Sequence, residues 1–203
     1  MNDLAFQKSK VALLIIDMQK AFVYPEGSLS RLGLDTSRTT IAIEPVRQLK
    51  AACREAGRPV LYLQHTHRPD GSDAGLIAKV FPPIMAMGHC VDGTWDQEII
   101  DELRPEIGDI IIKKHRFSGF YHTQLEDVLR SLGVEQLIVA GIATNICVES
   151  TIRDAFYRDI NVFVPREATA SYTAEQEESA LGNFRFAFAR VITLAETLAL
   201  LAT

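Results

Sequence analysis

The sequence predicts an α/β fold in which helices cover both faces of a mainly parallel β-sheet. Apolar runs typical of strands alternate with helical patterns along most of the 203 residues, as in βαβ units. The predicted strands are almost continuously apolar, as strands that are buried on both faces must be. The length and the hydrophobic fraction of 47% suit a substantial core, and no repeat or linker interrupts the chain. We therefore expect one domain over residues 1–203.

The order of the elements follows from the spacing of the apolar residues. Strands are expected near residues 11–16, 59–64, 109–114, 136–141 and 160–164, with a weaker strand near 190–192. Helices are expected near residues 37–57, 96–104, 122–132, 147–158, 174–188 and 193–201. Two stretches with several Gly and Pro residues, 24–35 and 65–94, lack a regular period, and we expect them to form loops.

Charge and cysteine content exclude several classes of protein. The formal net charge of −5 argues against binding to nucleic acid or to an anionic membrane. The first ten residues lack the apolar segment of a signal peptide, and the run Val11–Ile16 is too short to span a bilayer. Cys53, Cys90 and Cys147 provide neither a disulfide framework nor a paired metal-binding spacing. We therefore expect a cytoplasmic protein with neither a nucleic-acid nor a membrane partner.

Three ionisable side chains stand where predicted strands end. Asp17 follows the run Val11–Ile16, Lys114 ends the run that starts at Ile110, and Cys147 lies between the strand near 136–141 and the next helix. The carboxyl ends of strands in an open parallel sheet face one crevice. A carboxylate, an amine and a thiol that are distant in sequence are therefore expected to meet there.

Cys147 is the candidate nucleophile. The N–H groups and the positive end of the following helix favour a thiolate over a thiol. Backbone N–H groups in the turn 142–146 could hold the oxyanion of a tetrahedral intermediate. The alternative is a small buried residue at a tight strand–helix junction, since cysteine is among the most buried residue types.

Asp17 and Lys114 would supply the proton transfer and the positive charge that a thiol nucleophile needs. As a base, Asp17 would take the thiol proton and return it to a departing amine. The Lys114 ammonium would lower the pKa of Cys147 and hold Asp17 ionised. Lys113 and Lys114 should point to opposite sides of their strand, and Lys114 is favoured because it comes last. The alternatives are a carboxylate that caps a turn and two solvated lysines at a strand edge.

Three motifs surround these residues, namely Ile16–Gln19, Lys114 with Arg116–Phe120, and Gly141–Thr151. In this order they resemble the isochorismatase-like cysteine hydrolases, and Gly93–Trp95 and Arg153–Ala155 fit the same family. The resemblance extends over residues 10–195. It implies a three-layer α/β/α fold, which is the isochorismatase-like hydrolase fold.

The resemblance also implies a covalent mechanism. Asp17, Lys114 and Cys147 match the catalytic triad of the family, and the N–H groups of Ala143 and Cys147 would form the oxyanion hole. A cis peptide bond would join Ile142 to Ala143. The expected substrate is a small molecule, and a homodimer or homotetramer is the expected assembly.

These observations together predict a cysteine amidohydrolase that cleaves the C–N bond of a small linear amide, ureido or carbamoyl compound through a thioester. Residues 61–65 and 145–150 are most similar to the ureidoacrylate and biuret amidohydrolases of the family. Three alternatives stay open: a vinyl-ether hydrolase of the isochorismatase type, a nicotinamidase, and a non-catalytic assembly protein on the same fold. The thiol favours the amidohydrolase, because isochorismatases proper do not need it.

Four residues are candidates to line the substrate pocket, although each also fits a core or structural position: Phe22, Trp95, Phe117 and Asn145. We expect no cofactor. The alternative is a metal ion, because imidazole and carboxylate groups suit zinc, iron or manganese. Its ligands would be His65, His67, Asp73 and His89, with His65 standing where the metal-binding branch of the family has an aspartate.

Overall fold

The computed structural model describes residues 5–202, and a parallel β-sheet forms the centre of this part of the chain. Seven strands take part in the order β3-β2-β1-β4-β5-β7, and β6 pairs with the end of β4. The strands are β1 (Val11–Ile16), β2 (Val60–His65), β3 (Ile110–Lys114), β4 (Gln136–Ile142), β5 (Asn161–Pro165), β6 (Thr169–Ala170) and β7 (Arg190–Ile192). The predicted parallel sheet is confirmed, and β6 is a strand that the sequence pattern missed.

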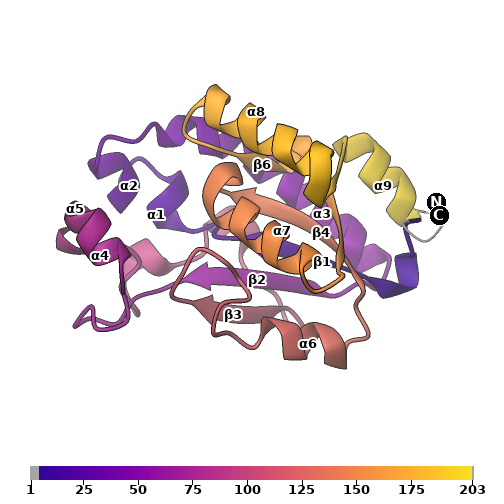
Figure 1. Ribbon diagram of the computed structural model, residues 1–203, viewed down its shortest axis with the longest axis horizontal. Coiled ribbons are helices and arrows are strands. Elements are labelled where there is room, and N and C mark those ends of the chain that lie inside the picture. Colours follow the sequence, from indigo (N-terminus) through magenta and orange to yellow (C-terminus); the bar gives the residue numbers. More distant parts are fainter. Residues whose placement is uncertain (1–4, 203) are drawn as a thin grey trace.

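Helices cover both faces of the sheet (Figure 1). α3 (Ile43–Glu55) and α9 (Leu194–Ala202) pack on the face to which Leu13 of β1 points. α6 (Leu125–Ser131), α7 (Glu149–Phe156) and α8 (Ala174–Asn183) pack on the opposite face, where Leu14 lies. The two buried clusters follow the alternation of side chains along a strand, and the fold has the predicted three layers.

Four short helices lie at the carboxyl ends of the strands (Figure 1). They are α1 (Lys20–Val23), α2 (Ser28–Arg31), α4 (Ile77–Val80) and α5 (Pro82–Ala86). All except α1 lie within the two stretches predicted as loops. These segments surround the edge of the sheet at which Asp17, Lys114 and Cys147 were expected. Within the described residues, no helix combines the length and the apolar character needed to cross a membrane.

The predicted helix near 96–104 is wrong. Two 3₁₀ turns, Trp95–Gln97 and Asp101–Leu103, stand there instead, with extended backbone between them. The extended part bonds to the segment after β1: Lys20 N donates to Glu98 O at 2.8 Å, and Ile100 N donates to Met18 O at 3.0 Å. These long-range hydrogen bonds replace those that a helix would have made locally.

Gly141 sets how closely β4 approaches β1 beside the candidate site. Its φ is 121°, a conformation that L side chains rarely adopt, and a Cβ there would overlap the backbone oxygen of Ile16. Ile16 and Gly141 are paired in the sheet, directly before Asp17 and before the cis peptide bond between Ile142 and Ala143. Glycine therefore fixes the spacing of the two strand ends.

We expect Gly141→Ala to lower the free energy of unfolding by about 2–4 kcal/mol, because the alanine combines an unfavourable φ with a backbone overlap. Denaturant unfolding followed by circular dichroism measures the change. Gly182→Ala is the matched control: Gly182 lies inside α8 with open space around it, so alanine should raise stability by up to about 1 kcal/mol. Unchanged stability of Gly141→Ala would contradict the overlap.

Candidate active site

The order of the strands places Asp17, Lys114 and Cys147 around one point. The strand order reverses between the neighbours β1 and β4, which is where open α/β sheets bind ligands. Asp17 follows β1, and Cys147 lies in the turn after β4. Lys114 ends β3, two strands from β1, so its side chain must pass the end of β2 across roughly 10 Å. The Lys114 and Asp17 side chains extend toward each other, and together with the 2.7 Å hydrogen bond between them they cover this span.

Lys114 contacts both of the other residues. Its Nζ donates to Oδ2 of Asp17 at 2.7 Å and lies 3.5 Å from Sγ of Cys147. It also donates to the backbone oxygen of Arg116 at 3.1 Å. Asp17 and Lys114 are fully buried, whereas the neighbouring Lys113 is exposed and pairs with Asp92. The structure therefore brings the three predicted residues together, with Lys114 rather than Lys113 in the crevice.

Burial controls the protonation of the site. It raises the pKa of Asp17 above its ordinary value, although the Lys114 ammonium opposes this effect. Burial and then the Asp17 carboxylate also raise the pKa of Cys147, and together they outweigh Lys114. Burial alone would lower the pKa of Lys114, but the negative charges of Asp17 and Cys147 raise it, so the amine keeps its proton.

The resting state of Cys147 therefore differs from the expectation of a thiolate. Cys147 lies in a π-helical turn, Thr144–Val148, and α7 begins only at Glu149. Burial and the Asp17 carboxylate outweigh the Lys114 ammonium, so the resting group is a thiol. Such a thiol needs a base, and Asp17 is the carboxylate nearest to it in this network.

His65 holds Lys114 from the side of β2. Its Nδ1 lies 3.3 Å from Lys114 Nζ, and its Nε2 lies 2.9 Å from Nε2 of His67. Burial lowers the pKa of His65 well below its ordinary range, so the imidazole is neutral. A neutral ring that accepts from Lys114 at Nδ1 donates its Nε2 proton to His67. The histidine thus restricts the orientation of the ammonium.

The three histidines and the aspartate proposed as metal ligands are not gathered into one set. His65 and His67 hydrogen-bond to each other, and His67 Nδ1 lies 3.5 Å from Asp73. His89 instead bonds through Nδ1 to Oγ of Ser28 at 2.7 Å. A metal ion held by His65, His67, Asp73 and His89 therefore does not fit the arrangement of these donors.

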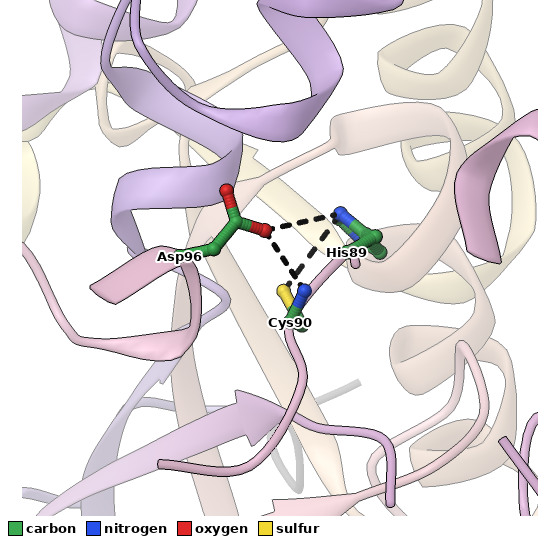
Figure 2. A group of neighbouring side chains, drawn as sticks. All are labelled: His89, Cys90 and Asp96. Atoms are coloured by element: carbon green, nitrogen blue, oxygen red, sulfur yellow. Dashed lines mark hydrogen bonds and ion pairs between the residues drawn. The ribbon is translucent and has the colours of Figure 1, made fainter. Parts of the chain in front are cut away.

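A different group, His89, Cys90 and Asp96, lies close enough to be considered as a ligand set (Figure 2). The carboxylate of Asp96 is already used: Oδ1 accepts from Ser28 N at 2.8 Å, and Oδ2 accepts from Ser28 Oγ and Cys90 N. Burial raises the pKa of Cys90 well above its ordinary value, and its Sγ accepts a hydrogen bond from Nε2 of Gln19 at 3.7 Å. We interpret this group as a hydrogen-bond network that connects α2 to the loop that contains Cys90.

A cavity of about 200 Å³ opens beside Cys147. Ala143 and Cys147, the two residues expected to form the oxyanion hole, both line it. Its walls are otherwise formed by Phe22, Leu29, Leu34, His65, Ile77, Phe81, Ile84, His89, Phe117, Ile146, Tyr172 and Gln176.

The four predicted pocket residues divide into two pairs. Phe22 and Phe117 lie on the cavity wall. Trp95 lies elsewhere, 42% exposed, with its ring 5.3 Å from Lys20 Nζ. Asn145 also lies outside the wall, where its Oδ1 accepts from Ser171 Oγ at 2.8 Å. The structure therefore brings only the two phenylalanines of this set to the cavity.

Sequence reasoning missed Tyr172. This residue follows β6, the two-residue strand that was not predicted, and precedes Thr173, which caps α8. The signal that the sequence offers for β6 is a short run of residues with high β-propensity before the residue that caps α8. Nothing in that pattern shows that β6 lies beside β4 and so carries Tyr172 to the cavity.

Comparison with known proteins points to one family. Residues 11–196 match the Isochorismatase domain. The chain is 39% identical over 178 residues to the ureidoacrylate amidohydrolase RutB of Methylorubrum extorquens, covering 82% of this chain and 72% of that protein. It is 36% identical over 203 residues to the protein of the same name from Stutzerimonas stutzeri, covering 91% and 80%.

Solved structures give the same result. A cysteine hydrolase from Pseudomonas syringae has a TM-score of 0.89 at 31% identity, covering 97% of this chain and 94% of that one. The N-carbamoylsarcosine amidase from Thermoplasma acidophilum has a TM-score of 0.76 at 30% identity, covering 91% and 96%.

Proposed function

Because the chain belongs to the isochorismatase family and is a hydrolase that acts on C–N bonds, we propose that it is a cysteine amidohydrolase for a small linear amide, ureido or carbamoyl compound. The observation that carries this proposal is the position of Lys114 Nζ, in contact with both Asp17 and Cys147 at the wall of a cavity. A cysteine that merely fills a strand–helix junction would need neither the buried ion pair nor the cavity.

In the first half of the reaction, Asp17 takes the proton of Cys147, and Sγ attacks the carbonyl carbon of the substrate. The N–H groups of Ala143 and Cys147 hold the oxyanion, and each such donor contributes about 3–4 kcal/mol. The intermediate then collapses with cleavage of the C–N bond. Asp17 returns the proton to the departing nitrogen, which leaves as ammonia or an amine, and the acyl group stays on Sγ as a thioester.

In the second half, Asp17 takes a proton from water while the oxygen attacks the thioester carbon. The C–S bond breaks, and Asp17 returns the proton to Sγ. The balance is amide plus water giving acid plus ammonia or amine, with the protein unchanged. Lys114 stays protonated throughout and offsets the negative charge that passes between Asp17 and Cys147.

Ammonia release from a panel of small primary amides and ureas tests the reaction. We expect ammonia from at least one compound and, with hydroxylamine present, the matching hydroxamate, because hydroxylamine intercepts a thioester before water does. Mass spectrometry of the quenched mixture should place the acyl group on Cys147. Acylation confined to Cys53 or Cys90, or turnover without a trappable acyl group, would contradict the proposal.

A further inference from the structure

The cavity beside Cys147 has no charged side chain on its wall. None of the described residues that line it is Asp, Glu, Lys or Arg. Asp17 and Lys114 pair with each other, and neither is among the residues that line the cavity. Burial lowers the pKa of His65 well below its ordinary range and that of His89 to about 4, so both imidazoles are uncharged at neutral pH.

We propose that the substrate is an uncharged amide or urea whose body is apolar, an inference that rests on the proposed function. A carboxylate placed among Phe22, Ile84 and Phe117 would lose its hydration without gaining a cationic partner. An ammonium group would likewise find no anion. Ureidoacrylate, which gives the curated relatives their name, is itself a carboxylate, so this chain is expected to differ from them in substrate.

Arg116 is a cation close to the cavity, but it bonds to the surrounding loop. Arg116 lies at a smaller neighbouring hollow, which shares Phe117 and His65 with the cavity. Its Nη1 donates to the backbone oxygens of Asp73 and His115, at 2.5 and 2.7 Å. The guanidinium also packs against Gly75, where a Cβ would overlap it. Arg116 is thus held against the backbone and is not among the residues that line the cavity.

The size of the cavity limits the body of the substrate. An apolar cavity of roughly 150 Å³ holds one benzene molecule in another protein. The cavity here has about 200 Å³, and Cys147 stands at its wall. A branched aliphatic chain of similar size, together with the reacting amide group, therefore matches the available space.

Tyr172 supplies a hydrogen bond to such a substrate. Its side chain is 8% exposed, and its buried hydroxyl has no hydrogen-bond partner among residues 5–202. A buried hydroxyl without a partner is unfavourable, so a ligand atom that accepts its proton is favoured. Burial keeps the phenol protonated, so the group acts as a donor.

Matched substrates test the absence of charge. 4-Methylpentanamide and succinamate have the same shape, as do 3-methylbutylurea and 3-ureidopropionate, and each pair differs by a carboxylate. We expect kcat/KM for ammonia release to be at least about 100-fold higher for the uncharged member of each pair. Equal or faster turnover of the anionic members would overturn the inference while leaving the proposed chemistry in place.

Binding to Cys147→Ala separates the two proposals. Isothermal titration of this variant should show binding of the uncharged amide and none of its anionic partner. Binding of the uncharged amide without ammonia release by the wild type would contradict the chemistry and keep the substrate class. Preferred binding of the anion would overturn the substrate class.

Tyr172→Phe tests the hydroxyl independently. We expect KM for the uncharged amide to rise about 10-fold while kcat changes by less than about 3-fold, because the lost bond contributes to binding the ground state and the transition state alike. Tyr157→Phe is the matched control, since Tyr157 is 70% exposed and lies away from the cavity. An unchanged KM in Tyr172→Phe would overturn the assignment of its hydroxyl.

Discussion

Cys147→Ala is expected to lower kcat/KM for an accepted amide by at least about 10⁴-fold, because removal of a nucleophile from a covalent mechanism removes the whole pathway. The variant should keep its fold, since alanine differs from cysteine only by the missing sulfur atom and therefore fits the same position. Ammonia release measures activity, and circular dichroism with thermal unfolding checks the fold.

Cys53→Ala is the matched control for this experiment. Cys53 is another fully buried cysteine, but it belongs to α3 on the far side of the sheet from Cys147. We expect Cys53→Ala to keep kcat within about 2-fold of the wild type, with a small loss of stability from the missing sulfur atom. A Cys147→Ala variant as active as Cys53→Ala would end the case for a covalent mechanism.

Lys114→Met is expected to lower the free energy of unfolding by about 3–5 kcal/mol, because it leaves the buried carboxylate of Asp17 without its cation. Activity should fall at least about 10³-fold, since the charge beside Cys147 is lost as well. Denaturant unfolding and ammonia release measure the two effects on the same preparation.

Two further variants show whether the loss of stability in Lys114→Met comes from the unpaired buried charge. Asp17→Asn combined with Lys114→Met removes both charges, so it should regain most of the stability while staying inactive. Lys113→Met removes the adjacent exposed lysine, whose pairing with Asp92 is solvated, and should change stability by less than about 1 kcal/mol. A Lys114→Met variant as stable as Lys113→Met would show that the buried pair contributes nothing.

The location of the site could be predicted from the sequence, because it depends on where the strands end. Asp17 and Lys114 each follow an apolar run long enough to identify a buried strand, and the topology of a parallel sheet brings such ends together. Whether Lys113 or Lys114 faces the crevice depends on strand alternation, which is also a local property. These features need no knowledge of which loops cover the edge.

The residues of the cavity wall were harder to predict from the sequence, because loops form most of the wall. Tyr172 reaches the cavity through β6, whose two residues are too few to give a pattern. Trp95 was expected at the pocket, but the 3₁₀ turn that carries it packs its ring against Lys20 and Tyr24 instead. Long-range hydrogen bonds to residues 18–20 fix that segment, and no local periodicity reports them.

The protonation of Cys147 could not be predicted from its place beside a helix. Proximity to Lys114 favours the anion, whereas burial and the Asp17 carboxylate oppose it more strongly. Burial is a property of the whole fold, so the balance appears only once the surrounding layers are known.

The buried, protonated state of Cys147 also affects how readily the protein is inactivated by oxidation. Peroxide and alkylating agents attack thiolates far faster than thiols, so oxidation to a sulfenic acid is slow while no substrate is bound. Proton removal coincides with attack on the amide, which confines the reactive anion to the moment of turnover. Cys53 and Cys90 are shielded by the same burial, so none of the three cysteines offers an exposed thiolate to an oxidant while the protein is idle.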